Sequence, residues 1–104
     1  LMSLEDIQNM LDSTGIRFSY HHWEKPPGLP YGVFLDPYSN NFMADNQVYK
    51  SIKHIQIELY AEGKDTAAEG AIEAALNDHE MPFEKEFSYI PEERLYETIY
   101  EIEV

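Results

Sequence analysis

Two adjacent histidines, His21 and His22, are the residues of this sequence that most suggest a metal site. Imidazole nitrogens are common transition-metal ligands. The pair falls in an aromatic-rich run, Phe18 to Trp23, that we interpret as a strand, and neighbouring side chains of a strand point to opposite faces. The two rings are therefore not expected to share a metal. Nothing in the sequence indicates that His54 or His79 lies close to them. We expect a structural or solvent-exposed role for both and predict no metal site.

Carboxylates are abundant, and three of them, Glu97, Glu101 and Glu103, share one face of a predicted strand. General acid–base catalysis needs a carboxylate that is desolvated so that its pKa rises, whereas these form a strip that we expect to be solvated. The glycines are scattered outside any phosphate-binding pattern, and no Ser, His and Asp arrangement is apparent. We predict no catalytic residue, no cofactor and no enzymatic activity.

The charge balance excludes several classes of partner. Twenty acidic residues against seven basic ones give a formal charge of −13. Binding to nucleic-acid backbones and docking to anionic membranes both need clustered Lys and Arg. The absence of cysteine excludes disulfides and fits a reducing compartment. No apolar run approaches the ~20 residues that span a bilayer, and no secretion signal is expected at the N-terminus.

The hydrophobic periodicity predicts a single domain over residues 1–104, with elements in the order α-β-β-β-α-β-β. We expect an α+β fold, a mostly antiparallel five-stranded sheet with two helices on one face and tyrosines, glutamates and His54 on the other. Ser3 and Asp65 are the expected helix N-caps. The predicted elements are a helix over 4–13, strands over 18–23, 31–35 and 48–61, a helix after Asp65, and strands over 83–89 and 95–104.

The segment 38–46 has neither helical nor strand periodicity and is long for a connection. It carries asparagines around an apolar centre, Phe42 and Met43. Phe42 could fold back against the edge of the core, or it could insert into a neighbouring subunit, because an aromatic ring left in water is unfavourable. The tyrosines on predicted strands allow the same two interpretations, sheet packing or a subunit contact: Tyr60, Tyr89, Tyr96 and Tyr100.

Several stretches resemble small proteins encoded in tailed phages and prophages of Gram-positive bacteria, in the head–tail gene cluster just before the major tail protein. The resemblance covers nearly the whole chain and brings no catalytic residue with it. The stretches are Leu4-Glu5-Asp6-Ile7, Tyr31 to Leu35, Ser39-Asn40-Asn41-Phe42-Met43-Ala44-Asp45-Asn46 with Val48-Tyr49, Ile57-Glu58-Leu59-Tyr60 with Lys64-Asp65, Glu84-Lys85, and Glu92 to Ile102.

Those proteins are similar in size and element order to the tail terminator or tail-to-head joining proteins of long-tailed phages. The resemblance implies an α+β subunit of a hexameric ring that caps the tail tube and meets the head connector. The implied partners are further copies of the chain, the major tail protein and the head connector protein, in the virion and, during assembly, in the host cytoplasm. The residues expected at the subunit contact are Asn40, Asn41, Phe42, Asp45, Asn46 and Tyr49.

Three alternatives stay open at this point. The chain could be another small head–tail connector or tail-completion protein. It could be an acidic regulatory module that mimics DNA, which needs carboxylates at phosphate-like spacing. It could be a small-molecule or hydrolytic domain, which needs a pocket with a perturbed titratable group. Because anionic subunits repel one another, we expect any ring to tighten with salt.

Overall fold

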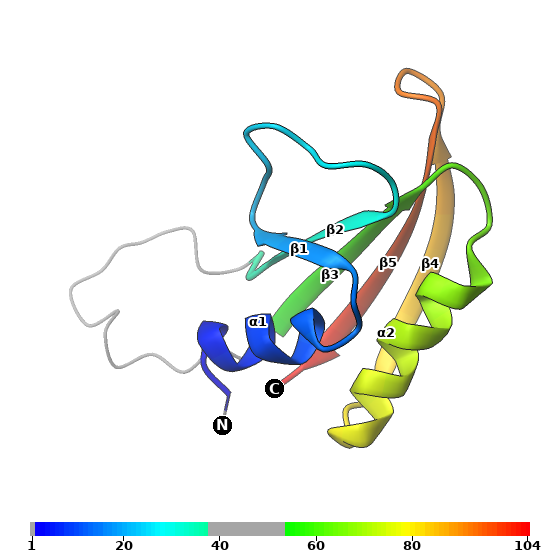
Figure 1. The fold of residues 1–104 in the computed structure, drawn as a ribbon. Helices are drawn as coiled ribbons and strands as arrows, with labels where there is room; N and C mark the ends of the chain where they lie inside the picture. The colour runs from blue at the N-terminus through cyan, green and yellow to red at the C-terminus, as the bar shows by residue number, and fades with distance from the viewer. Residues whose placement is uncertain (1, 38–53) are drawn as a thin grey trace.

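The computed structural model describes residues 2–37 and 54–104, which form two helices and five strands (Figure 1). The elements follow in the order helix, three strands, helix, two strands. They are α1 (Leu4–Asp12), β1 (Arg17–Tyr20), β2 (Tyr31–Leu35), β3 (His54–Ala61), α2 (Thr66–Asp78), β4 (Phe83–Ile90) and β5 (Leu95–Glu103).

The strands form one sheet in the order β1-β2-β3-β5-β4. Strand pairs β2–β3, β3–β5 and β5–β4 are antiparallel, but β1 runs parallel to β2, so the sheet is mixed. Because both β3 and β4 are antiparallel to β5, they run in the same direction with β5 between them. The segment β3–α2–β4 is therefore a split β-α-β unit, in which a helical crossover joins two strands of the same direction.

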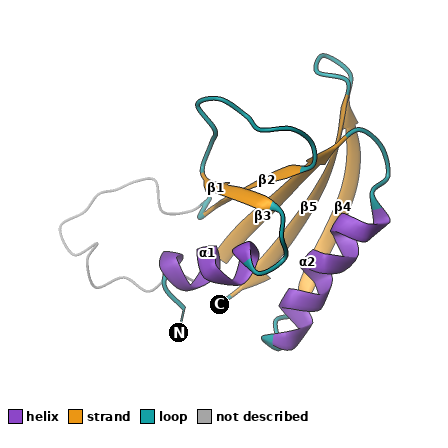
Figure 2. Ribbon diagram, viewed as in Figure 1, coloured by secondary structure: helices purple, strands orange, loops and turns teal. Residues whose placement is uncertain are grey.

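Both helices lie on the same face of the sheet (Figure 2). The apolar stripe of α1 contributes Ile7 and Leu11, and α2 contributes Ile72 and Leu76; all four are fully buried together with Ile57 of β3. Removing side chains of this size from water stabilises the fold by ~1.5–3 kcal/mol each. The α+β class predicted from the periodicity is thus confirmed.

Local chemistry fixes the ends of both helices as the sequence predicts. The Ser3 hydroxyl accepts a hydrogen bond from the Asp6 amide at 3.1 Å, while the Asp6 carboxylate accepts from the Ser3 amide at 2.9 Å, which is a reciprocal capping box. The Asp65 carboxylate accepts from the Ala68 amide at 3.0 Å and caps α2. Gly15, at a φ of +83°, provides the left-handed residue that ends the turn after α1.

The first strand is shorter than the predicted Phe18–Trp23, because His21 has a φ of +73° and interrupts the extended backbone. The parallel pairing with β2 places Phe18 beside Gly32. A Cβ at Gly32 would lie 2.1 Å from Cε1 of Phe18, so the ring occupies the space that a side chain would need. Of the predicted strand over 48–61, the structure describes His54–Ala61 as β3, and residues 48–53 lie outside the described part.

Candidate interaction surface

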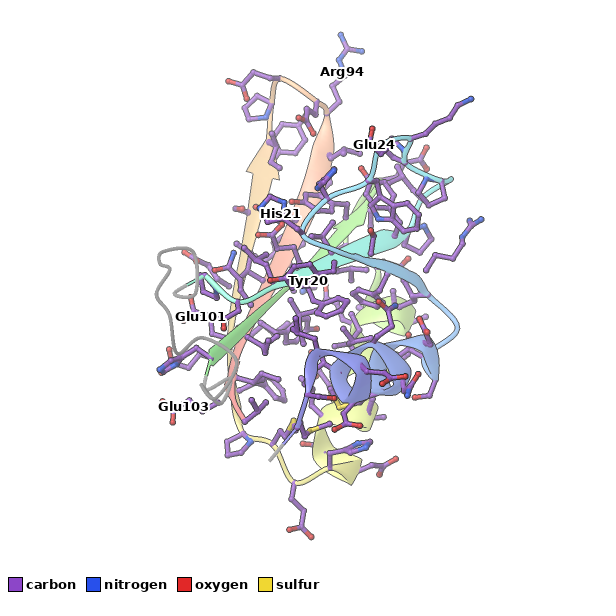
Figure 3. All side chains as sticks on the ribbon, turned by 90° about the vertical axis from the view of Figure 1, so that its left-hand side faces the viewer. Tyr20, His21, Glu24, Arg94, Glu101 and Glu103 are labelled. Atoms are coloured by element: carbon purple, nitrogen blue, oxygen red, sulfur yellow. The ribbon has the colours of Figure 1, made fainter. Side chains whose placement is uncertain are left out.

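The face of the sheet turned away from the helices is dominated by glutamates. The pairing of β3, β5 and β4 puts Ile99 between Glu58 and Glu86 in one row across the sheet, and puts Glu101 between Gln56 and Glu84 in another. Figure 3 shows Glu101 and Glu103 on the side of the sheet opposite α1. We call this set the glutamate face: Glu58, Glu84, Glu86, Glu97, Glu101 and Glu103.

The part of this surface formed by β3, β4 and β5 carries no Lys or Arg. Two shallow hollows, of about 540 and 300 Å³, share Glu84 and Glu101 in their linings. Lys85 also lines the smaller one, but its ammonium group contacts Glu69 and Glu73 of α2.

His54 is the basic side chain that β3 places on the glutamate face, with Nδ1 4.0 Å from Oε2 of Glu103. Carboxylates with no Lys or Arg on the same face produce a negative potential that repels anions and attracts cationic groups. Glu101 and Glu103 are exposed, as the predicted solvated strip requires, but the expectation is wrong for Glu97, which is half-buried. All three carboxylates belong to a wider acidic surface.

A hydrogen-bonded group joins β3 to β5 on the glutamate face. The Tyr60 hydroxyl lies 2.7 Å from Oε1 of Glu58 and 2.9 Å from Oε2 of Glu97, and Nε2 of Gln56 donates to Glu58 at 2.6 Å. Burial raises the pKa of Glu97, and the charges of nearby glutamates add to that rise. Burial and the two carboxylates also raise the pKa of Tyr60, so this phenol stays protonated and acts as a donor.

A second polar cluster lies under α2, where Glu69 is 3% exposed. Its Oε1 is 2.9 Å from Nζ of Lys64 and 2.8 Å from Nζ of Lys85, and Lys85 also contacts Oε2 of Glu73 at 2.6 Å. Burial acts to raise the pKa of Glu69, but hydrogen bonds from the two lysines outweigh it and hold the pKa below its usual range. Tyr100 donates to Glu73 at 2.8 Å. These groups are paired with one another, which is the arrangement of a structural cluster.

Sequence reasoning missed the cluster around Glu69. A usable signal was present, since Glu69 is three residues before Ile72 and seven before Leu76 and therefore lies on the apolar stripe of α2. A charged residue on such a stripe needs a partner of opposite charge. The partners lie before α2 and on β4, at Lys64 and Lys85.

The tyrosines are divided between the two faces, which corrects the expectation that they line the outer one. Tyr100 pairs with Ile57 and is fully buried under the helices, so it packs in the sheet core. Tyr89 and Tyr96 share that helix-side face, with ring centroids 4.8 Å apart, and Tyr89 is 47% exposed. Tyr60 alone of the four lies on the glutamate face.

The histidine pair follows β1 instead of lying within a strand. His21 and His22 are exposed, and their Nδ1 atoms are 3.2 Å apart, so the alternation argument used to separate them was wrong. His22 also contacts Glu24 at 3.2 Å between Nε2 and Oε2. Across residues 2–37 and 54–104, no group of three or more His, Cys, Asp or Glu is placed to hold a metal ion.

The expected subunit-contact residues lie outside the described residues, so the structure does not place them: Asn40, Asn41, Phe42, Asp45, Asn46 and Tyr49.

The comparisons with known proteins identify no family for this chain. No family model, no curated protein and no solved structure matches the chain. None of the helices in the described ranges combines the length and apolarity that a membrane-spanning helix requires.

Proposed function

We propose that the chain is a structural protein of the phage head–tail junction, where copies of it form a ring that caps the tail tube and joins it to the head connector. The observation that carries this proposal is the glutamate face, where β3, β4 and β5 place six carboxylates and no Lys or Arg on the side of the sheet away from both helices. In this proposal the chain performs no covalent chemistry.

A ring at the head–tail junction must let DNA through without retaining it. Phosphates bind surfaces that carry Lys and Arg, because such binding releases condensed counterions. A lumen lined by the glutamate face would instead repel the phosphates and leave the DNA free to move.

Self-association has to overcome the formal charge of −13 that each copy carries. Repulsion between exposed charges weakens as the Debye length falls, from about 10 Å at 0.1 M salt to about 3 Å at 1 M. Apolar contact must supply the attraction, and Tyr20 and Leu29 offer it near the β1 edge at 40% and 38% exposure. The ring is therefore expected to form more readily at high salt or on a tail tube.

Electron microscopy of the concentrated protein, together with its solution mass at low and high salt, tests the ring directly. We expect particles with a central hole, and a mass that grows with salt. A charge-reversed variant, Glu84→Lys with Glu86→Lys and Glu101→Lys, should give rings that retain DNA. The matched control reverses Glu24, Glu62 and Glu92, which are exposed outside the glutamate face, and should not retain it. A monomer under every condition, including with tail tubes, would overturn the proposal.

The glutamate face also favours a second function, an acidic regulatory module that mimics DNA. Carboxylates two residues apart along a strand are separated by about 6.6 Å, and neighbouring strands repeat the pattern, so an extended array of negative charge faces one direction. Such a module would copurify with a basic DNA-binding protein and compete with DNA for it. Competition without ring formation would favour this function over the head–tail proposal.

A further inference from the structure

Strand β4 forms an outer edge of the sheet and is paired only with β5 among the described strands. Its pairing runs without interruption from Phe83 opposite Ile102 to Ile90 opposite Leu95. The strand contains no proline, and its six central residues, 84–89, are all exposed. Each edge strand presents backbone N–H and C=O groups that another strand can pair with. The eight residues of β4 are thus a regular template for an added strand.

Proteins usually guard such an edge with prolines, bulges or outward-pointing lysines. Lys85 is the one basic residue of β4, but its ammonium group is held by Glu69 and Glu73 at 2.8 and 2.6 Å. It is therefore turned towards α2 and does not block the edge. The charges that remain at the edge are those of Glu84 and Glu86.

The other side of β4 is apolar and accessible. Phe87 is 41% exposed and Tyr89 is 47% exposed. The ring of Tyr96 lies against both, with centroid distances of 5.6 Å to Phe87 and 4.8 Å to Tyr89, and Nζ of Lys64 lies 4.4 Å from the centre of the Phe87 ring. The aromatic side chains are held in place by these contacts and leave part of their surface for a partner.

The charge pattern selects against pairing of β4 with a second copy of itself. Edge-to-edge pairing continues the sheet, so the glutamate faces of the two copies would come to lie side by side. Like charges on neighbouring strands are destabilising, whereas opposite charges at facing positions are stabilising. A partner strand with Lys or Arg on that face is therefore favoured over a second acidic chain.

We propose that β4 binds an extended basic segment of another protein, which pairs with its outer edge as a sixth strand. Antiparallel to β4, the segment places Lys or Arg opposite Glu86 and Glu84, and β-branched or aromatic residues opposite Tyr89 and Phe87. Backbone hydrogen bonds provide affinity in this mode of recognition, and the alternating side chains provide specificity. This inference does not depend on the head–tail proposal, because it uses only the edge, the charges and the exposed rings of the single chain.

The test is binding of a labelled seven-residue peptide that carries valines opposite the aromatic side chains and lysines opposite Glu86 and Glu84. We expect saturable binding that weakens with salt. A peptide of the same composition without the alternation, and one with glutamates in place of the lysines, should bind at least roughly ten-fold more weakly, given the size of cross-strand pair energies. Equal binding of the alternating and rearranged peptides, or no binding of any peptide, would overturn the proposal.

Two double variants distinguish binding of the peptide at the β4 edge from non-specific electrostatic attraction of the peptide to the glutamate face. The variant with Glu84→Lys and Glu86→Lys should no longer bind the lysine peptide and should bind the glutamate peptide instead. The variant with Glu101→Lys and Glu103→Lys makes the same charge change on β5, the strand next to β4, and should still bind the lysine peptide better than the glutamate peptide. If the two double variants lose the lysine peptide equally, strand addition is wrong. Circular dichroism checks that each variant is folded.

N-methylation of the peptide tests the backbone pairing without altering the protein. Only alternate amides of an added strand point to its neighbour. Methylation of one alternate set should abolish binding, and methylation of the other set should leave it largely unchanged. Equal tolerance of both modifications would show that side-chain charge alone holds the peptide, against the proposal.

Discussion

Tyr60 and Glu97 face each other across the β3–β5 pair, with the phenol oxygen 2.9 Å from Oε2 of Glu97. The same oxygen lies 2.7 Å from Oε1 of Glu58. A phenol has one proton to donate, so it satisfies one carboxylate at a time. A proton on Glu97 would complete the second hydrogen bond, and burial together with nearby glutamates raises the pKa of Glu97 in the direction that favours this proton.

Replacing Glu97 with glutamine should stabilise the protein at neutral pH. Because the pKa of Glu97 is higher in the folded chain than in the unfolded one, ionising it lowers stability. That penalty is absent below the unfolded pKa and complete above the folded pKa. We expect Glu97→Gln to raise the free energy of unfolding at pH 7 by ~0.5–1 kcal/mol, the scale of a relieved like-charge contact. The gain should shrink as the pH falls to about 4.

Urea unfolding followed by circular dichroism between pH 4 and 8 measures this effect. Glu103→Gln is the matched control, because Glu103 is on the same strand and face with its side chain 82% exposed, and it should change stability little. A Glu97→Gln variant that is less stable than wild type at pH 7 would contradict the expected direction.

Replacing the buried Glu69 with glutamine should destabilise the protein. The variant keeps the size of the side chain but removes the charge that pairs with Lys64 and Lys85. Loss of charged hydrogen bonds of this kind costs about 2 kcal/mol. Because the pKa of Glu69 is lowered in the fold, its contribution is present above the unfolded pKa and is lost as the pH falls through the folded pKa.

The same unfolding experiment applies to Glu69→Gln, with Glu62→Gln as the control at an exposed position. The difference between wild type and Glu69→Gln should be largest near neutral pH and diminish in acid. If both variants lose the same small amount, then Glu69 is not the centre of a buried ion cluster.

Gly32 should tolerate no side chain while Phe18 is beside it. A Cβ at Gly32 would lie 2.1 Å from Cε1 and 2.5 Å from Cδ1 of Phe18, and relieving such overlap costs about 1–3 kcal/mol. Gly28→Ala is the control, since nothing lies within 4 Å of its added Cβ. Adding Phe18→Leu to Gly32→Ala should recover part of the loss. Thermal unfolding compares the variants, and similar melting temperatures for Gly32→Ala and Gly28→Ala would argue against the close contact.

The sequence predicts the local features of this fold well because they depend on neighbouring residues. Ser3 and Asp65 cap helices through amides three residues away, and alternation in 95–103 separates the apolar face of β5 from its glutamates. The strand order was not predicted, because alternation specifies faces and not partners. The parallel β1 and the position of Tyr100 beside Ile57 both depend on that order.

The candidate surface was predictable only in part for the same reason. The row Glu97, Glu101 and Glu103 follows from alternation along one strand, but its union with Glu58, Glu84 and Glu86 requires the β3-β5-β4 order. The edge position of β4 also comes from that order, and it could not be inferred from a strand whose residues alternate like those of its neighbour.

Trp23 is the sole tryptophan of the chain, and its indole nitrogen donates to the carbonyl of Gly32 at 2.9 Å while its ring lies 6.2 Å from that of Tyr31. Intrinsic indole fluorescence therefore arises from one place, the β1–β2 end of the sheet, which is the edge opposite β4. The protein thus contains a natural optical reporter that can distinguish loosening of this end from melting of the whole sheet.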